Sequence, residues 1–252
     1  MTKIIAHRGA RNLWAENSLE GFRNAVALGV GAVEFDLHLG ADGAVLVIHD
    51  ATLDRTTTAN GPVRYLTKTS RHNLCLIGPD GEIDEGVPIL SEVLEIIAPC
   101  AGLRIMPEFK ADETGFYDPV LIETTVDILR DYGLAPRTTL HSFDIQVLHL
   151  LARIAPEFDR MISVNANWAA RHGGIEAVIG QVRDLVSIIA IEQELFEAEF
   201  DRITALFPLE RLSVWTVNDP GSIAHWLARG PGYLTSDDPQ LALSIQLAEA
   251  MV

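Results

Sequence analysis

The chain has few cysteines and few basic residues, and both shortages narrow the classes of protein to which it can belong. Only two cysteines occur among the 252 residues, Cys75 and Cys100, and they lack the spacing of a metal-binding motif. We expect them to be buried free thiols, with a single disulfide as the alternative. The 19 Lys and Arg residues stand against 35 Asp and Glu residues, a formal net charge of −16. Because a field of this sign repels polyanions, nucleic acid and anionic membranes are not expected partners.

Long apolar runs are also missing. No stretch reaches the roughly 18 apolar residues of a membrane span. Residues 3–7 already have the pattern of a strand, which leaves no room for the basic region and apolar core of a secretion signal. We therefore expect a cytoplasmic protein, and the sequence does not indicate whether it forms a homo-oligomer.

Segments with the pattern of strands alternate with segments that have the period of helices along the whole chain. The expected strands are residues 3–7, 32–39, 103–109, 138–143, 161–164, 184–191, 212–217 and 233–236. This alternation predicts an α/β protein, a (β/α)8 TIM barrel that forms one domain over residues 1–252. The rival is a doubly wound open sheet, which usually carries a glycine-rich phosphate loop after its first strand. Gly9 follows His7-Arg8 without a G-x-G-x-x-G pattern, so the barrel is preferred.

Residues 51–88 interrupt this alternation. They contain the turn sequences Asn60-Gly-Pro62 and Gly78-Pro-Asp-Gly81 and show little periodicity. We expect a short insertion, placed after the hairpin of the second strand, that lies over the C-terminal mouth of the barrel. A loop of this length inside a compact domain is more often functional than idle.

The second expected strand carries the residues around which the chemistry is predicted. Glu34, Asp36 and His38 alternate with apolar residues, so their side chains share one face of the strand. The apolar face of a barrel strand packs against helices, so Glu34 and Asp36 should point inward, where like charges are costly unless a cation lies between them. Glu108, from the neighbouring strand, completes an oxygen-only cluster that suits Mg2+ or Ca2+ better than zinc. The alternative for Glu108 is a structural ion pair with Lys110.

Two histidines are expected at the same mouth. His7 ends the first strand, and a hairpin turn at residues 41–43 returns the chain so that His49 arrives beside the carboxylates. General acid–base catalysis needs one group that removes a proton and another that donates one, and imidazole suits both roles near neutral pH. A hydrogen-bonded core histidine is the alternative for each. A structural or surface role is the preferred interpretation for His38, His141, His149, His172 and His225.

Other strand ends supply candidate contacts to a substrate. Arg8 and Lys110 can hold phosphate oxygens, and a guanidinium can do so through two parallel hydrogen bonds. Phe143 and Trp215 would form an apolar wall for the alcohol part of the substrate, although core packing explains them about as well.

The residues at these strand ends resemble those of the glycerophosphodiester phosphodiesterase family, whose members are metal-dependent (β/α)8 barrels. The matching motifs follow one another across nearly the whole chain: His7-Arg8-Gly9, Glu16-Asn17-Ser18, Glu34-Phe-Asp36, Asp42-Gly43, His49-Asp50, Leu53-Asp-Arg55-Thr-Thr57, Pro88-Ile-Leu90, Glu108-Phe-Lys110, Ser142-Phe143, Trp215-Thr-Val-Asn218 and Thr235 to Pro239. The resemblance implies that Glu34, Asp36 and Glu108 are the metal ligands. It also implies that His7 and His49 are the acid–base pair and that Arg8 and Lys110 contact phosphate.

The chain departs from the family pattern in three places. Ala15 stands where the family usually has proline, residues 74–78 replace a glycine- and aromatic-rich patch, and the last strand begins without the usual aspartate. These departures bear on the choice of substrate rather than on the metal site.

The sequence thus predicts an enzyme that hydrolyses glycerophosphodiesters to glycerol 3-phosphate and an alcohol, using Mg2+ or Ca2+ and two histidines. The nucleophile is water or the glycerol hydroxyl of the substrate itself, with His7 preferred as base and His49 as acid. One alternative is a phospholipase D-like phosphodiesterase or lyase that acts on a bulkier diester. A barrel that binds phosphorylated ligands without catalysis is the other.

Overall fold

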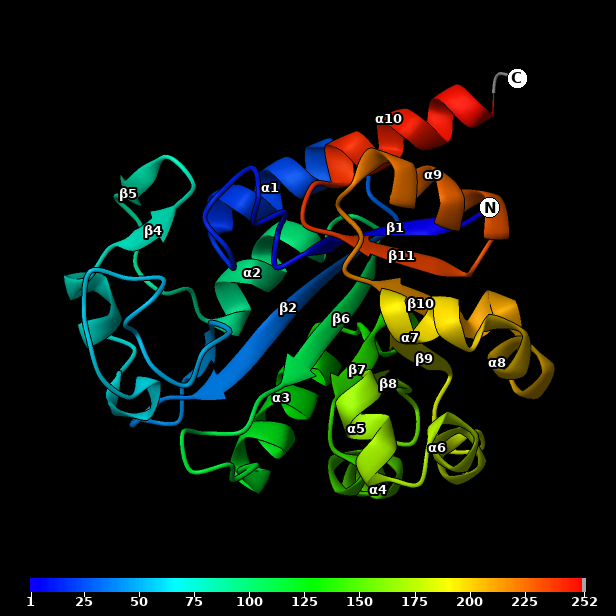
Figure 1. Ribbon diagram of the computed structural model, residues 1–252. Helices are drawn as coiled ribbons and strands as arrows, with labels where there is room; N and C mark the ends of the chain where they lie inside the picture. Colours follow the sequence, from blue (N-terminus) through cyan, green and yellow to red (C-terminus); the bar gives the residue numbers. More distant parts are fainter. Residues whose placement is uncertain (251–252) are drawn as a thin grey trace.

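A closed barrel of parallel strands forms the centre of the computed structural model, which describes residues 1–250 (Figure 1). The barrel strands, in order, are β1 (Lys3–His7), β2 (Ala32–Leu39), β6 (Arg104–Phe109), β7 (Thr139–Ser142), β8 (Asp159–Val164), β9 (Ile188–Glu192), β10 (Leu212–Trp215) and β11 (Tyr233–Ser236). The first strand, β1, pairs in parallel with β2 on one side and with β11 on the other, which closes the sheet. The predicted (β/α)8 TIM barrel is confirmed.

Helices follow the strands and cover the outside of the barrel (Figure 1). They are α1 (Leu19–Ala27), α2 (Leu90–Ile97), α3 (Pro119–Asp131), α4 (Ile145–Ile154), α5 (Ala166–Arg171), α6 (Ile175–Val182), α7 (Gln193–Ala198), α8 (Phe200–Leu206), α9 (Pro220–Arg229) and α10 (Pro239–Glu249). The strand expected from residue 184 begins only at Ile188. The preceding residues belong to the turn that ends α6, because the amides of Leu185 and Val186 both donate to the carbonyl of Val182.

The two faces of β2 have different surroundings, as its alternation predicts. Val33, Phe35 and Leu37 are fully buried in the main apolar core. The ring of Phe35 meets the edge of Phe22 from α1, with 5.6 Å between the ring centroids. Because this outward face is fixed by apolar packing, worth roughly 1.5–3 kcal/mol for each large side chain, the polar alternates must face the barrel interior.

The expected hairpin after β2 is present, and the insertion follows it. Strand β3 (Val45–Val47) pairs antiparallel with β2. Residues 51–88 lie beside the carboxyl end of β2 and contain η1 (Val63–Tyr65), η2 (Ser70–Asn73) and a small hairpin of β4 (Leu76–Gly78) and β5 (Gly81–Ile83) (Figure 1). Apolar side chains of this segment form a separate small core against Leu46 and Ile48. Its role as a cover over the barrel mouth stays a prediction.

The two cysteines, Cys75 and Cys100, are free thiols, as expected, but they are half-buried rather than buried. Within residues 1–250, no helix combines the length and the apolar character needed to cross a membrane.

A buried arginine attaches the inserted segment to the barrel, and we expect its partner to matter for stability. The Arg71 guanidinium donates to both carboxylate oxygens of Glu92 on α2, at 2.9 and 2.6 Å, and to the carbonyl of Val87. Arg71 is only 4% exposed, so Glu92→Gln leaves a buried charge without its counterion. Because Glu92 is itself half-buried, we expect the free energy of unfolding to fall by about 2 kcal/mol, less than for a fully buried pair.

Denaturant unfolding of Glu92→Gln measures this loss, with the exposed Glu95→Gln on the same helix as control. Burial raises the pKa of Glu92, but Arg71 outweighs it, and the net pKa lies below its ordinary value of 4.5. The ion pair therefore stabilises the protein fully above pH 4.5 and progressively less as the pH falls below it. The prediction would be contradicted if Glu92→Gln and Glu95→Gln lowered the free energy of unfolding equally. It would also be contradicted if the loss in Glu92→Gln became larger as the pH falls.

Candidate active site

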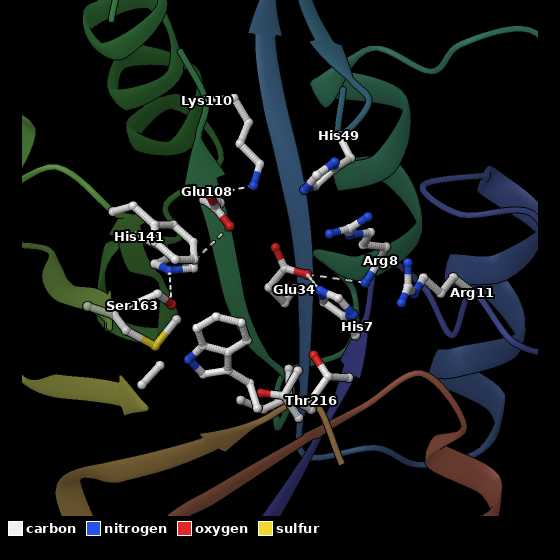
Figure 2. Close-up of a pocket in the computed structure, with 16 residues that line it drawn as sticks. His7, Arg8, Arg11, Glu34, His49, Glu108, Lys110, His141, Ser163 and Thr216 are labelled. Atoms are coloured by element: carbon white, nitrogen blue, oxygen red, sulfur yellow. Dashed lines mark hydrogen bonds and ion pairs between the residues drawn. The ribbon is translucent and has the colours of Figure 1, made fainter. Parts of the chain in front are cut away.

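A cavity of about 290 Å3 lies toward the carboxyl ends of the barrel strands. Its lining includes every predicted site residue except Asp36, namely His7, Arg8, Glu34, His49, Glu108, Lys110, Phe143 and Trp215. Figure 2 shows Glu34 projecting into the middle of the cavity, with Glu108 and His141 on one side and His7 and Arg8 on the other. The barrel thus gathers side chains that the sequence distributes over several strands, as expected for the functional face of this fold.

Glu34, Glu108 and His141 form a cluster that fits a divalent cation. Each offers one potential ligand atom, and these atoms all lie within 4.8 Å of one another. All three residues are buried, and among the described residues neither Oε1 of Glu34 nor Nδ1 of His141 has a hydrogen-bond partner. Buried polar atoms are rarely left without a partner, and carboxylate oxygens and imidazole nitrogens are both ligands of divalent cations.

Asp36 is turned toward positively charged groups of the protein itself. Its Oδ1 lies 3.1 Å from Nζ of Lys110, and its Oδ2 lies 3.4 Å from Nε of Arg8 and accepts a hydrogen bond of 2.9 Å from Asn17. The same Nζ of Lys110 is 2.5 Å from Oε1 of Glu108, so the ion pair considered for Glu108 is present. The Lys110 ammonium therefore contacts two of the predicted metal ligands. The ligand role of Asp36 stays a prediction.

The unequal distribution of positive charge separates the acidities of these carboxyl groups. Burial, and then the charges of Asp36 and Glu108, raise the pKa of Glu34 well above its ordinary value. Burial acts in the same direction on Asp36, but Lys110 and Arg8 outweigh it and hold the pKa of Asp36 well below its usual range. Glu34 thus lacks the compensating positive charge that Asp36 has, and a divalent cation would supply it.

His7 is held by a carboxylate that follows the last strand. Its Nδ1 is 2.5 Å from Oδ1 of Asp237, which also accepts a hydrogen bond of 2.7 Å from Nε of Arg11, while Oδ2 accepts one from Asn218. The opposite ring nitrogen, Nε2, lies 3.7 Å from Glu34. Burial lowers the pKa of His7 although Asp237 opposes it. The neutral ring therefore has Nε2 free to accept a proton on the side of the carboxylates.

His49 has a similar arrangement on another element. Its Nδ1 is 2.6 Å from Oδ1 of Asp50, and Arg55 of the inserted segment donates to both Asp50 and Glu16. Glu16 also accepts a hydrogen bond of 3.4 Å from Arg8. Burial lowers the pKa of His49, and hydrogen bonds from Arg55 lower the pKa of Asp50 to about 2. Asp50 therefore stays ionised and fixes the ring of His49, again with Nε2 as the free nitrogen.

Arg8 lies in a strained turn that places it against the carboxylates. Arg8, Gly9 and Ala10 all have positive φ angles, of 52°, 73° and 73°. For the two residues that are not glycine, such a conformation costs on the order of 1–3 kcal/mol each and is most common at functional sites. The turn directs the backbone N–H of Arg8 to Oε2 of Glu34, at 3.2 Å.

The two aromatic residues of the predicted apolar wall both line the cavity. Phe143 and Trp215 meet edge to face, with 5.7 Å between the ring centroids and an interplanar angle of 82°. Nζ of Lys110 lies 5.6 Å from the centroid of Phe143. Both rings line the cavity rather than the core between barrel and helices. Contact of these rings with a substrate stays a prediction.

Three residues of the site were not assigned a role by sequence reasoning. His141 was expected to be structural or on the surface, whereas it lines the cavity beside Glu108, its register partner on the adjacent strand. Asp237 and Arg11 support His7 from both ends of the chain. The position of Asp237, directly after the last strand, was a usable signal, because polar residues at such positions face the mouth of a barrel.

We expect Asp237→Asn to slow turnover without loss of the fold. The amide of asparagine can donate to Nδ1 of His7 and so favours the tautomer in which Nε2 is no longer free to accept a proton. We expect kcat to fall about 10²-fold or more with little change in KM, as when a carboxylate that orients a catalytic histidine is replaced by an amide. The matched control is Asp238→Asn, because Asp238 only caps α10 through the amide of Leu241 and asparagine caps equally well. Equal activity of the two variants would refute the role given to Asp237.

Fold and site together define a TIM barrel whose carboxylates and histidines fit acid–base chemistry beside a divalent cation. The chain belongs to the glycerophosphoryl diester phosphodiesterase family, since the model of this family matches residues 7–241. Family membership confirms the resemblance seen in the sequence motifs.

Two curated relatives are similar to the chain over part of its length. A glycerophosphodiester phosphodiesterase of Caldanaerobacter subterraneus subsp. tengcongensis is 32% identical over 157 residues, which cover 62% of this chain and 63% of that protein. An uncharacterized protein of Bacillus subtilis is 30% identical over 164 residues, 66% of its length. The match therefore spans slightly less than two thirds of the length of these curated relatives.

Solved structures agree over almost the whole chain. The crystal structure of a glycerophosphodiester phosphodiesterase from Agrobacterium tumefaciens str. C58 is 28% identical, with a TM-score of 0.72, and the match covers 97% of this chain and 100% of that one. A phosphodiesterase of Oleispira antarctica, solved in complex with the product sn-glycerol-3-phosphate, is 24% identical with a TM-score of 0.78 and coverage of 97% and 96%. The second likeness shows the shared fold.

Proposed function

We propose that this protein hydrolyses glycerophosphodiesters to glycerol 3-phosphate and an alcohol with the help of a divalent cation. One observation carries the proposal: His7 and His49, each fixed at Nδ1 by a carboxylate, line the same cavity as Glu34 and Glu108. Two separately oriented imidazoles can act as base and acid on one phosphodiester. Membership of the family and the product held by the Oleispira antarctica phosphodiesterase support the choice of substrate.

Glu34, Asp36 and Glu108 are the proposed metal ligands, and Mg2+ or Ca2+ is the proposed cation. When bound, the cation would polarise a phosphoryl oxygen and offset charge that develops in the transition state. The orphaned Oε1 of Glu34 supports a cation at this place. Arg8 and Lys110 are proposed to hold the remaining phosphate oxygens, and both are already directed at the carboxylates by ion pairs.

The proton transfers are assigned to the two histidines. His7 is the proposed base, because its Nε2 is free and faces Glu34 in the middle of the cavity. It removes the proton from the attacking oxygen, which belongs to water or to the glycerol hydroxyl of the substrate. His49 is the proposed acid, and it protonates the oxygen of the departing alcohol. Phe143 and Trp215 are proposed to contact that alcohol.

The test is the release of glycerol 3-phosphate from glycerophosphocholine, measured with Mg2+ or Ca2+ and again after addition of a chelator. We expect release that depends on the metal and returns when the metal is restored. A cyclic phosphate as the final product, observed by phosphorus NMR, would favour the phospholipase D-like alternative. Binding of glycerol 3-phosphate without turnover of any diester would favour the non-catalytic barrel.

Two further expectations from the sequence belong to this proposal. The protein is proposed to act in the cytoplasm on a small molecule, without nucleic acid or membrane as a partner. The net charge of −16 supports both exclusions, since it disfavours polyanionic surfaces.

A further inference from the structure

We propose that His141 is a nitrogen ligand of the bound cation, together with Glu34 and Glu108, and that the site therefore prefers a divalent first-row transition metal over Mg2+ or Ca2+. This inference rests on the metal dependence included in the proposed function. It revises the Mg2+ or Ca2+ named there, because an imidazole ligand changes the class of metal that the site prefers.

Strand register places His141 next to a carboxylate. His141 on β7 is the parallel partner of Glu108 on β6, so both side chains leave adjacent strands at the same level. Both point into the cavity, where Figure 2 shows them on the same side of Glu34. The potential ligand atoms of the three residues lie within 4.8 Å of one another. Three atoms at this spacing can surround one ion.

The ring of His141 is fixed with one particular nitrogen toward the carboxylates. Its Nε2 is 2.7 Å from Oγ of Ser163 on β8, a hydrogen bond that is buried. A histidine that binds a metal commonly donates its other ring N–H to such a partner, which sets the tautomer and the orientation of the ring. Phe143 packs beside the imidazole, with 5.7 Å between the ring centroids. Rotation of the ring would break the bond to Ser163.

The other nitrogen makes no hydrogen bond to any residue from 1 to 250. Nδ1 of His141 lies 3.5 Å from Oε2 of Glu108, and within the described residues it makes no hydrogen bond, although His141 is only 4% exposed. With the proton on Nε2, the lone pair of Nδ1 faces a carboxylate oxygen, an arrangement that is unfavourable unless a cation lies between them. Oε1 of Glu34 is likewise buried without a partner. In this tautomer two unsatisfied buried acceptors, Nδ1 of His141 and Oε1 of Glu34, converge with a second carboxylate on one place.

The chemistry of this ligand set points to the class of metal. Mg2+ and Ca2+ select oxygen ligands, whereas an imidazole nitrogen is better suited to transition metals. Glu34 and Glu108 supply two negative charges, one of which Lys110 already offsets. The expected occupant is therefore a cation that accepts both oxygen and nitrogen, and Mn2+ is a probe of this kind with a spectroscopic signal.

The experiment is electron spin echo spectroscopy of the full chain loaded with Mn2+. We expect modulation from a directly bound 14N nucleus, replaced by that of 15N when the protein is grown with ring-15N histidine. His141→Gln should abolish the nitrogen signal and weaken Mn2+ binding about 10²-fold, with Mg2+ binding changed by less than about threefold. The control is His172→Gln, because His172 stacks on Trp168 outside the cavity and should leave both properties unchanged.

A second variant keeps the test decisive if His141→Gln does not fold. In the double variant His7→Gln/His49→Gln, His141 is the only imidazole left among the described residues that line the cavity, and the nitrogen signal should persist. Oxygen-only coordination in the wild-type protein would overturn the inference, as would loss of the signal in the double variant or its survival in His141→Gln. Glycerol 3-phosphate release with oxygen-only coordination would refute this inference alone. A nitrogen signal without such release would refute the proposed function alone.

Discussion

The His49→Ala variant is expected to release glycerol 3-phosphate about 10³-fold more slowly than the wild-type protein, the usual scale for loss of a general acid or base. The ring of His49 is fixed by Asp50, which Arg55 keeps ionised, so its free Nε2 is directed at the cavity. If His49 is the acid, the alcohol must depart from the variant as an alkoxide, because no positioned side chain protonates its oxygen. The fold should survive, because His49 is half-buried at the end of a hairpin and supports no part of the main core.

The measurement compares two substrates. If His49 is the acid, a glycerophosphodiester with a p-nitrophenol leaving group should largely restore the rate of His49→Ala, because p-nitrophenolate departs without a proton. The same substrate should not restore the rate of His7→Ala, since His7 is the proposed base. If the p-nitrophenol substrate restored the rate of His7→Ala instead, His7 would be the acid and His49 the base. Full activity of His49→Ala on glycerophosphocholine would remove His49 from the mechanism.

The Glu34→Gln variant is expected to lose both cation binding and activity, and yet to be at least as stable as the wild-type protein when no metal is present. Glu34 is buried beside Asp36 and Glu108, and these neighbours raise its pKa well above the ordinary value. Removing its charge relieves this repulsion while keeping the shape of the side chain. The affinity for a divalent cation should fall by at least about 10²-fold. Loss of a residue that only orients a metal ligand already lowers metal affinity by about 10- to 100-fold, and Glu34 is proposed to be a ligand itself.

Thermal unfolding with and without metal tests this pairing of effects. A cation at about 100 times its Kd stabilises the wild-type protein by about 2.7 kcal/mol, and the same concentration should leave Glu34→Gln unchanged. The exposed Glu123→Gln on α3 serves as control and should respond to metal like the wild-type protein. A metal-induced increase in Tm in Glu34→Gln would show that the cation binds elsewhere.

The sequence by itself determined the architecture and most of the residues around the cavity. Strand and helix periods along the chain were sufficient for the barrel, and the alternation in β2 placed Glu34 inward because Val33 and Phe35 need apolar neighbours. Functional residues of a barrel lie at the carboxyl ends of its strands, and from this rule His7, His49 and Glu108 were expected at one cavity, which they line. Each of these inferences needs only the period of an element and the side on which it packs.

Tertiary structure alone decided which of these side chains pair with one another. Closure of the barrel brings Asp237 to His7, residues that lie 230 positions apart in the chain. The register between β6 and β7 sets His141 beside Glu108, and the ammonium of Lys110 lies between Glu108 and Asp36. The physical reason is that periodicity fixes the face on which a side chain lies, but hydrogen bonds and ion pairs depend on distances of a few ångströms between strands. Those distances exist only once the first and last strands have met.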